Sequence, residues 1–208
     1  MAMQIGIVAD IHDAVKPLTK ALSILRGRGA EQVVSLGDAF DSFRPGESAA
    51  EVARLLQVAG AVGVWGNHDA GLSLEVTEQM REAADPALLA FAARLRPQLV
   101  LEGCRFSHVE PWKDPCRLED LWWFEGLPGT GERARRSFDA VRERLLFVGH
   151  FHASLVMHAQ GQVEWNGVLP VKLSGLDRYL ILVPAVVDGW CEIFETERCL
   201  LMPIRCSV

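Results

Sequence analysis

The chain has 208 residues, of which 50% are hydrophobic and 23% are charged, and its formal net charge is −6. This length and composition are typical of a globular domain and exclude a fibrous or largely disordered chain. The net negative charge gives no general attraction for a polyanion, so composition disfavours nucleic acid as a partner.

The five cysteines are odd in number and form no Cys-x-x-Cys pair, which argues against a zinc ribbon or a redox motif. Reduced thiols are typical of the cytosol. The opening residues Met-Ala-Met-Gln lack a basic region and a cleavage site, so we expect no signal peptide. No apolar run is long enough to span a bilayer. We therefore predict a cytoplasmic protein without a membrane partner.

The first third of the chain alternates short apolar runs with amphipathic stretches. Residues 5–9, 32–36 and 61–65 are predicted as buried strands, and residues 14–26 and 47–59 as helices. Strands and helices that alternate through short links are typical of a parallel sheet with right-handed crossovers.

The remainder of the chain is less regular. Asp85-Pro86 predicts the start of a helix that runs to about residue 94, and residues 132–144 are predicted as another helix. Residues 99–101, 105–107 and 145–148 are strand candidates. After His152, short runs separated by Gly, Asp or Pro predict an antiparallel sheet with hairpins. We expect a single domain over residues 1–208, with two sheets.

Residues 111–131 show no clear periodicity and are expected to form an ordered aromatic loop near the site. Three tryptophans lie in this segment: Trp112, Trp122 and Trp123. Hydrophobic packing is the favoured interpretation for them, with a base-stacking platform as the alternative. The arginines at 133, 135 and 136 are expected on a solvated helix face rather than in a phosphate clamp.

Polar residues follow several of the predicted strands, at the edge where ligands collect in a parallel sheet. Their side chains offer nitrogen and oxygen donors without thiolate, a mixture that suits Mn, Fe, Zn or Ni. A carboxylate has two oxygens, so Asp38 can bridge two ions. The candidate ligands are Asp10, His12, Asp38, Asn67, His108, His150 and His152.

Two ions about 3.5–4 Å apart can share a water, convert it to hydroxide and pull on the oxygens of a phosphate. His68 lies beside Asn67, and the unperturbed pKa of a histidine is close to working pH. His68 is therefore the candidate general acid for the leaving group.

The ordered set of motifs resembles the calcineurin-like metallophosphoesterases, which carry D-x-H, G-D-x-x-D, G-N-H-D/E, a lone His and G-H-x-H. All five blocks are present in that order between Asp10 and His152, which is about three-quarters of the chain. In this sequence the blocks read Asp10-Ile11-His12, Gly37-Asp38-Ala39-Phe40-Asp41, Gly66-Asn67-His68-Asp69, His108 and Gly149-His150-Phe151-His152.

The resemblance implies an α/β fold, a four-layer α/β/β/α sandwich with two sheets packed between helices. It implies that His68 contacts the phosphate and that Asp41 holds the ring of His68. It also implies two ligand sets that share Asp38. The first set is Asp10, His12, Asp38 and His152, and the second is Asp38, Asn67, His108 and His150.

Within the family, the chain is similar to the small bacterial and archaeal phosphoesterases. The protein serine/threonine phosphatases carry Arg after the second Asp of their second block, where this chain has Ser42, and Glu where it has Asp69. One departure from the small phosphoesterases is the sequence Val183-Pro184-Ala185, which replaces their Asn-Pro-Gly-Ser turn.

We predict a dinuclear, metal-dependent phosphodiesterase or phosphomonoesterase that cleaves a small-molecule or nucleotide ester with a metal-bridging hydroxide. Two divalent transition-metal ions are expected as cofactors, with manganese preferred over iron, zinc or nickel. A small phosphorylated substrate is the expected partner, and the sequence leaves its identity and the oligomeric state open. Two alternatives remain: a non-catalytic, protein-binding member of the fold and a DNA nuclease.

Overall fold

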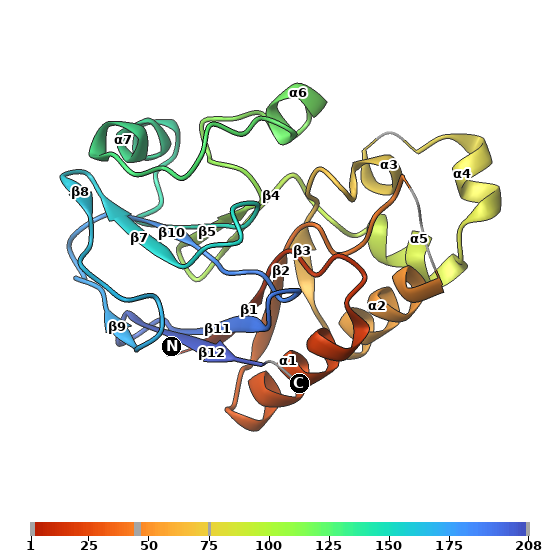
Figure 1. Ribbon diagram of the computed structural model, residues 1–208, viewed down its shortest axis with the longest axis horizontal. Helices are drawn as coiled ribbons and strands as arrows, with labels where there is room; N and C mark the ends of the chain where they lie inside the picture. Colours follow the sequence, from red (N-terminus) through yellow and green to blue (C-terminus); the bar gives the residue numbers. More distant parts are fainter. Residues whose placement is uncertain (1–2, 44–46, 75, 207–208) are drawn as a thin grey trace.

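The computed structural model describes residues 3–43, 47–74 and 76–206, and its strands form two sheets (Figure 1). The first sheet has the order β3-β2-β1-β11-β12-β9. Strands β1, β2 and β3 are parallel, whereas β11, β12 and β9 extend the sheet antiparallel. The strands of this sheet are β1 (Gln4–Val8), β2 (Gln32–Leu36), β3 (Val62–Val64), β9 (Val171–Lys172), β11 (Trp190–Glu195) and β12 (Leu200–Arg205).

The second sheet has the order β4-β5-β6-β10-β7-β8. Strands β5, β6 and β10 are parallel, and antiparallel strands flank them on both sides. The strands are β4 (Gln98–Leu101), β5 (Cys104–Ser107), β6 (Leu145–Val148), β7 (Leu155–His158), β8 (Gly161–Gln162) and β10 (Tyr179–Leu182).

The longer helices lie on the outer faces of the two sheets, while several short helices lie in the connections (Figure 1). Helix α5 begins as predicted, because Asp85 accepts a hydrogen bond from the backbone N–H of Ala87 and Pro86 occupies the first turn. The helices are α1 (Val15–Gly27), α2 (Glu47–Val58), α3 (Ala70–Ser73), α4 (Glu78–Ala83), α5 (Pro86–Ala92), α6 (Leu118–Leu121) and α7 (Gly131–Ala140).

Three hydrophobic clusters hold four layers together, which confirms the predicted α/β/β/α sandwich. The first cluster joins α1, α2 and α5 to the first sheet, for example through Leu25, Leu56 and Val33. The second fills the space between the sheets, where Ile7 and Phe147 are fully buried. The third packs α7 on the second sheet. Burial of these apolar faces is the main favourable contribution to this stacking.

Two expectations from the sequence are wrong. The strands after His152 do not form one antiparallel sheet, because β7, β8 and β10 join the second sheet and β9, β11 and β12 join the first. Strand β10 is moreover parallel to β6. The helix predicted for residues 132–144 ends at Ala140, because Val141 has extended backbone angles.

No helix in the described part of the chain is both long and apolar enough to cross a membrane. The expectation of no signal peptide rests partly on residues 1–2, which lie outside the described residues. All five cysteines are free thiols. Cys104 is buried, and burial raises the pKa of its thiol to about 12.

Candidate metal centre

The connections that follow β1, β2, β3, β5 and β6 meet at one edge of the sandwich and bring the predicted ligands together. Backbone hydrogen bonds fix the first two connections against each other: Asp10 N–H donates to Gly37 O over 3.1 Å, and His12 N–H donates to Asp38 O over 3.0 Å. The connection after β6 is fixed by His150 N–H, which lies 3.1 Å from both carboxylate oxygens of Asp10. The site therefore spans both sheets.

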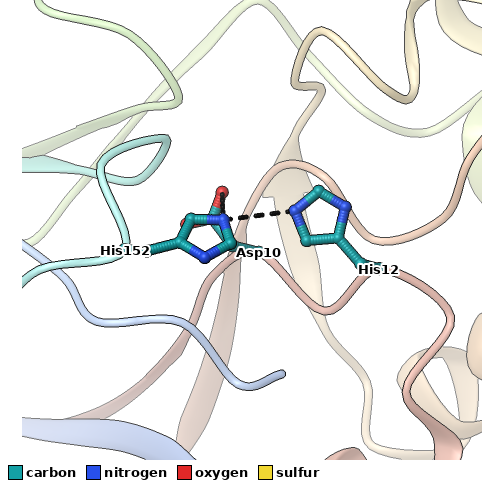
Figure 2. Close-up of side chains that lie close together, drawn as sticks. All are labelled: Asp10, His12 and His152. Carbon is teal, nitrogen blue, oxygen red and sulfur yellow. Dashed lines mark hydrogen bonds and ion pairs between the residues drawn. The ribbon is translucent and has the colours of Figure 1, made fainter. Parts of the chain in front are cut away.

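One group of donor atoms consists of Asp10, His12 and His152, which we name the outer set (Figure 2). The Nε2 atoms of His12 and His152 are 3.3 Å apart, and His152 Nε2 is 3.6 Å from Asp10 Oδ1. The side chains of His12 and His152 are 25% and 36% exposed, so this group opens to solvent.

A second group consists of Asn67, His108 and His150, which we name the inner set. Asn67 Oδ1 lies 2.9 Å from His108 Nε2 and 3.1 Å from His150 Nδ1, and these two ring nitrogens are 3.2 Å apart. His108 is fully buried, and its Nδ1 lies 2.8 Å from the backbone oxygen of Leu36. Because that contact requires a proton on Nδ1, the Nε2 atom of neutral His108 is left to bind a ligand.

Asp38 lies between the two sets. Its Oδ2 is 3.8 Å from His12 Nε2 in the outer set and 3.4 Å from His108 Nε2 in the inner set. Its other oxygen, Oδ1, accepts a hydrogen bond from the backbone N–H of His68 over 2.9 Å. The two groups contain the residues of the two ligand sets that the resemblance implies, with Asp38 near both, and His68 lies with His12 and Asp38 in a further group of donor atoms.

The donor atoms fit divalent metal ions in spacing and in chemistry. Ligands at about 2.1 Å from a shared ion lie roughly 3 Å from one another, which is the spacing within each set. The two Nε2 atoms of His12 and His152 face each other, and their lone pairs repel unless a proton or a cation lies between them. Imidazole, carboxylate and amide donors suit transition metals such as Mn, Fe, Zn or Ni.

Backbone strain is concentrated in the same residues. Five of the seven predicted ligands have positive φ angles: Asp10 (50°), His12 (47°), Asp38 (50°), His150 (68°) and His152 (50°). This left-handed region is uncommon for residues other than glycine and costs of order 1–3 kcal/mol for each residue. Such a concentration of strain is typical of a functional site, where the fold holds side chains in a fixed arrangement.

Two motif glycines are required by close approach of the connections. A Cβ atom on Gly66 would overlap the carboxylate of Asp38, and one on Gly37 would lie 2.7 Å from both Gly66 N and His108 Nδ1. Gly37 also has a φ of +89°. Glycine at these positions therefore allows Asp38 to reach the space between the two sets.

The buried charges in the site are strongly coupled. Burial alone favours the neutral forms of Asp38 and His108, but their mutual attraction and hydrogen bond outweigh it. This attraction holds the pKa of Asp38 well below its usual range and raises the pKa of His108 to about 9. A metal ion at the inner set would have to displace that proton from His108.

Two further carboxylates are buried, and the positive charge of His108 offsets only part of the effect of their burial. Burial raises the pKa of Asp10 to about 8, and burial together with the charge of Asp38 raises the pKa of Asp69 to about 7. Burial lowers the pKa of His150 to about 4, with the positive charge of His108 acting in the same direction. A neutral ring is the form that binds metal, and a cation nearby would return both carboxylates to their ionised forms.

His68 lies beside the outer set, with its ring centroid 4.9 Å from that of His12. His68 Nδ1 is buried, has no hydrogen-bond partner among the described residues, and is 3.9 Å from Asp41 Oδ1. This distance is too long for a hydrogen bond, so Asp41 faces the ring without bonding to it. Asp41 Oδ1 instead accepts the backbone N–H of Phe43 over 3.1 Å.

Asp69, which ends the third motif block, belongs to neither donor set. Asp69 makes no side-chain cap for α3. Its Oδ1 accepts hydrogen bonds from the backbone N–H groups of Ala39 and Phe40, and its Oδ2 accepts one from Gly66 over 2.9 Å. Asp69 therefore ties the connection after β2 to the connection after β3.

Asp188 was missed by the sequence analysis. It follows the departure at Val183-Pro184-Ala185, and its Oδ2 lies 3.3 Å from His152 Nδ1. The backbone N–H of Val187 also donates to Asp10 O over 3.2 Å, which fixes this connection beside the site. No local pattern marks Asp188, because it meets His152 only through the pairing of β10 and β11 with different sheets.

The expectation of a solvated helix face fails at Arg133. Its guanidinium donates to both oxygens of the buried Glu110 carboxylate, with Nη2 at 2.6 Å from Oε2. The side chain of Arg133 is 11% exposed, whereas Arg135 and Arg136 are exposed as predicted. A single carboxylate 23 residues earlier in the sequence decides which arginine is buried, and helical periodicity cannot reveal such a partner.

Comparisons with known proteins support the motif assignment. Residues 3–171 match the family model described as the calcineurin-like phosphoesterase superfamily domain. No curated protein sequence is a significant match to the chain. Among solved structures, a metallophosphoesterase from Sphaerobacter thermophilus is similar, with a TM-score of 0.77 and 22% identity, over 100% of this chain and 89% of that one.

Two further structures share the fold at lower identity. A hypothetical protein from Pyrococcus horikoshii has a TM-score of 0.67 and 12% identity, over 99% of this chain and 88% of that chain. A protein described as a novel archaeal phosphodiesterase has a TM-score of 0.55 and 17% identity, over 98% and 99% of the two chains.

Proposed function

We propose that this chain, which belongs to the calcineurin-like phosphoesterase superfamily, is a dinuclear metal-dependent phosphohydrolase that cleaves a small phosphodiester or phosphomonoester. The observation that carries the proposal is the arrangement of seven donor side chains in two sets that share Asp38. The archaeal phosphodiesterase with a similar fold makes a diester the first substrate to test. Manganese is the first metal to test, and the free thiols fit a cytoplasmic location.

The ligands of the two ions would be the outer and inner sets together with Asp38, whose Oδ2 atom faces both sets. Metal ions bound there would supply a Lewis acid for the phosphate oxygens and lower the pKa of a water to near neutrality. The chain itself contributes the fixed spacing. His108 is held through its Nδ1 by the backbone oxygen of Leu36, and His152 through its Nδ1 by Asp188.

His68 is proposed to protonate the leaving oxygen. Its Nδ1 is buried and faces Asp41, so Nε2 is the ring nitrogen that can reach a substrate. The ring is 30% exposed, which leaves it accessible beside the outer set. A positioned general acid of this kind contributes about 10²–10⁴-fold to a reaction rate.

Hydrolysis of bis-p-nitrophenyl phosphate and of p-nitrophenyl phosphate tests this function. The metal-free protein is loaded with Mn, Ni, Zn or Mg in parallel, and bound metal is counted by elemental analysis. We expect turnover of at least one ester, about two equivalents of bound metal, and loss of both with Asp38→Ala. Turnover that survives Asp38→Ala, or no turnover with any metal, contradicts the proposal.

The same experiment separates the two alternatives. A non-catalytic, protein-binding member of the fold predicts no turnover with intact metal content. A DNA nuclease predicts binding of DNA that weakens steeply as salt rises, because each neutralised phosphate releases a counterion. The net charge of −6 opposes this binding, and a DNA-binding titration at two salt concentrations measures it.

A further inference from the structure

The aromatic residues of the segment 111–131 separate into two groups with different environments. The ring of Trp123 packs at 5.1 Å from that of Trp112, and Lys113 Nζ lies 3.9 Å from the centroid of the Trp123 ring. Trp122 and Phe124, on either side of Trp123, are instead 47% and 60% exposed. Hydrophobic packing thus accounts for Trp112 and Trp123 but not for their two exposed neighbours.

The exposed pair lies on a segment that is held at both ends. The buried carboxylate of Glu110 precedes the segment, and the guanidinium of Arg133 follows it and binds that carboxylate through two nitrogens. Arg133 Nη1 also donates to the backbone oxygens of Glu125 and Gly126 over 3.0 Å. A charge-assisted, two-nitrogen contact of this kind fixes geometry as well as contributing energy. The backbone that carries the two exposed rings is therefore fixed in position by these contacts.

Both exposed rings border the metal centre. The Trp122 ring centroid is 5.0 Å from that of His68, and the Phe124 centroid is 5.9 Å from that of His150. Phe43, which is 52% exposed, approaches Trp122 at 6.2 Å from the opposite connection. Soluble proteins rarely expose several large apolar side chains next to one another. Where such a patch borders a polar site, it indicates contact with a ligand.

We propose that Trp122 and Phe124 form a subsite for a planar aromatic group carried by the phosphate ester, of which a nucleobase is the model. This inference rests on the proposed function, because the centre beside the rings must take the phosphate. Aromatic side chains stack on bases without requiring a particular sequence or hydrogen-bonding edge. Trp122 beside His68 would hold the group near the leaving oxygen, and Phe124 would border the inner set.

The charge around the subsite favours a mononucleotide-sized ligand over a nucleic-acid strand. Glu125 adjoins the exposed rings in the sequence, as do Glu119 and Asp120, which are paired with Arg117 and Lys113, respectively. The cations Lys113 and Arg133 are engaged with Asp120 and Glu110, respectively. A strand would bring further phosphates against these carboxylates, whereas a single nucleotide places its phosphate on the metal centre.

Calorimetric binding to the metal-loaded protein tests the subsite without relying on turnover. Three ligands share a phosphomonoester: adenosine 5′-monophosphate, ribose 5-phosphate and hexyl phosphate. We expect the adenosine nucleotide to bind roughly 5- to 100-fold more tightly than ribose 5-phosphate, the range that stacking on one base provides. Trp122→Ala should remove most of this preference, because it should weaken binding of the nucleotide and not of ribose 5-phosphate. Trp122→Phe should retain part of the preference.

Leu127→Ala is the matched control, because Leu127 is 50% exposed on the same segment. It should leave the nucleotide preference unchanged. Equal affinities of the wild-type protein for the nucleotide and for ribose 5-phosphate overturn the subsite. It is also overturned if hexyl phosphate binds as tightly as the nucleotide and Trp122→Ala weakens the binding of both equally. Turnover of bis-p-nitrophenyl phosphate is measured alongside. A nucleotide preference without turnover of any ester contradicts the proposed function alone, whereas turnover without the preference contradicts the subsite alone.

Discussion

The inner and outer donor sets share Asp38 and have similar donor spacing, yet they differ in how firmly the surrounding structure holds their histidines. His108 of the inner set is fully buried and held by the backbone oxygen of Leu36. His152 of the outer set is 36% exposed and held by Asp188, a side chain that is itself 57% exposed. A buried partner on a rigid strand preserves geometry more firmly than an exposed ion pair, which is worth little and is screened by salt. The inner set is therefore expected to contribute to the stability of the fold, and the outer set is where exchange with solvent is expected.

The largest effect is expected from His108→Ala. This change removes the cation that compensates Asp38 in the metal-free protein, and breaking a buried charge pair costs about 3–5 kcal/mol. Urea denaturation should show this loss, and ester hydrolysis should disappear. His158→Ala, which lies outside both sets, is the control and should preserve turnover. A stable His108→Ala protein would show that the inner set is no better supported than the outer set.

The metal-free protein is expected to lose stability as pH rises from about 4, where the two carboxyl groups ionise in the unfolded chain, to about 9. Burial raises the pKa of Asp69 to about 7 and of Asp10 to about 8, and Asp38 raises the pKa of His108 to about 9 against the effect of burial. In this window the folded state holds protons that the unfolded state has released, so stability falls as they dissociate. Denaturation in chelator at several pH values measures the slope, and excess divalent metal should flatten it.

Glu192 provides the control for that slope. It is buried between the sheets, and burial alone raises its pKa to about 8. Its contribution has the same sign but should persist when metal is bound, and Glu192→Gln should remove it. A slope that metal does not change would mean that the donor sets do not take up cations.

His68→Ala is expected to lower kcat by about 10²–10⁴-fold while leaving the bound metal unchanged. The reason is that His68 lies beside the outer set without completing either set. Steady-state kinetics and elemental analysis on the same sample separate the two effects. Asp41→Asn should have a smaller effect, since Asp41 is 3.9 Å from the ring. Normal turnover by His68→Ala protein would remove the general-acid role.

Asp188→Asn should weaken metal binding at the outer set by about tenfold, the lower end of the range for partners that orient a histidine ligand. The inner set should retain its ion, so a metal titration should show one affinity shifted and one unchanged. Val187→Ala, a change at the neighbouring exposed residue, is the control. If both affinities shifted together, the two sets would behave as one unit.

The smallest effect is expected from relieving backbone strain at His152. Its φ of 50° costs an ordinary residue of order 1 kcal/mol, which glycine avoids. In chelator, His152→Gly should therefore be more stable than His152→Ala by about 1 kcal/mol, although both lose activity. Cys199→Gly, at a φ of 49° away from the donor sets, should gain stability with activity intact. Equal stability of the two His152 variants would show that the connection relaxes without cost.

The sequence by itself determined the parallel strands of the first third and the start of α5, and it marked the seven candidate donor residues that the structure brings to one edge. These features follow from local causes: apolar runs, an N-cap followed by proline, and polar residues directly after strands. The resemblance of the ordered motifs also predicts which donors would share an ion, and the structure brings Asp10, His12 and His152 together in one group and Asp38, His108 and His150 in another.

Only the tertiary structure decided how the last strands divide between two sheets, because short apolar runs separated by turns do not specify their partners. It also decided the partners of Asp188, Arg133 and Trp122, which meet residues between 23 and 54 positions away in the sequence. Such contacts depend on which connections the two sheets bring to a common edge. A local pattern can mark a residue as polar or aromatic, but the folded chain alone determines what that residue faces.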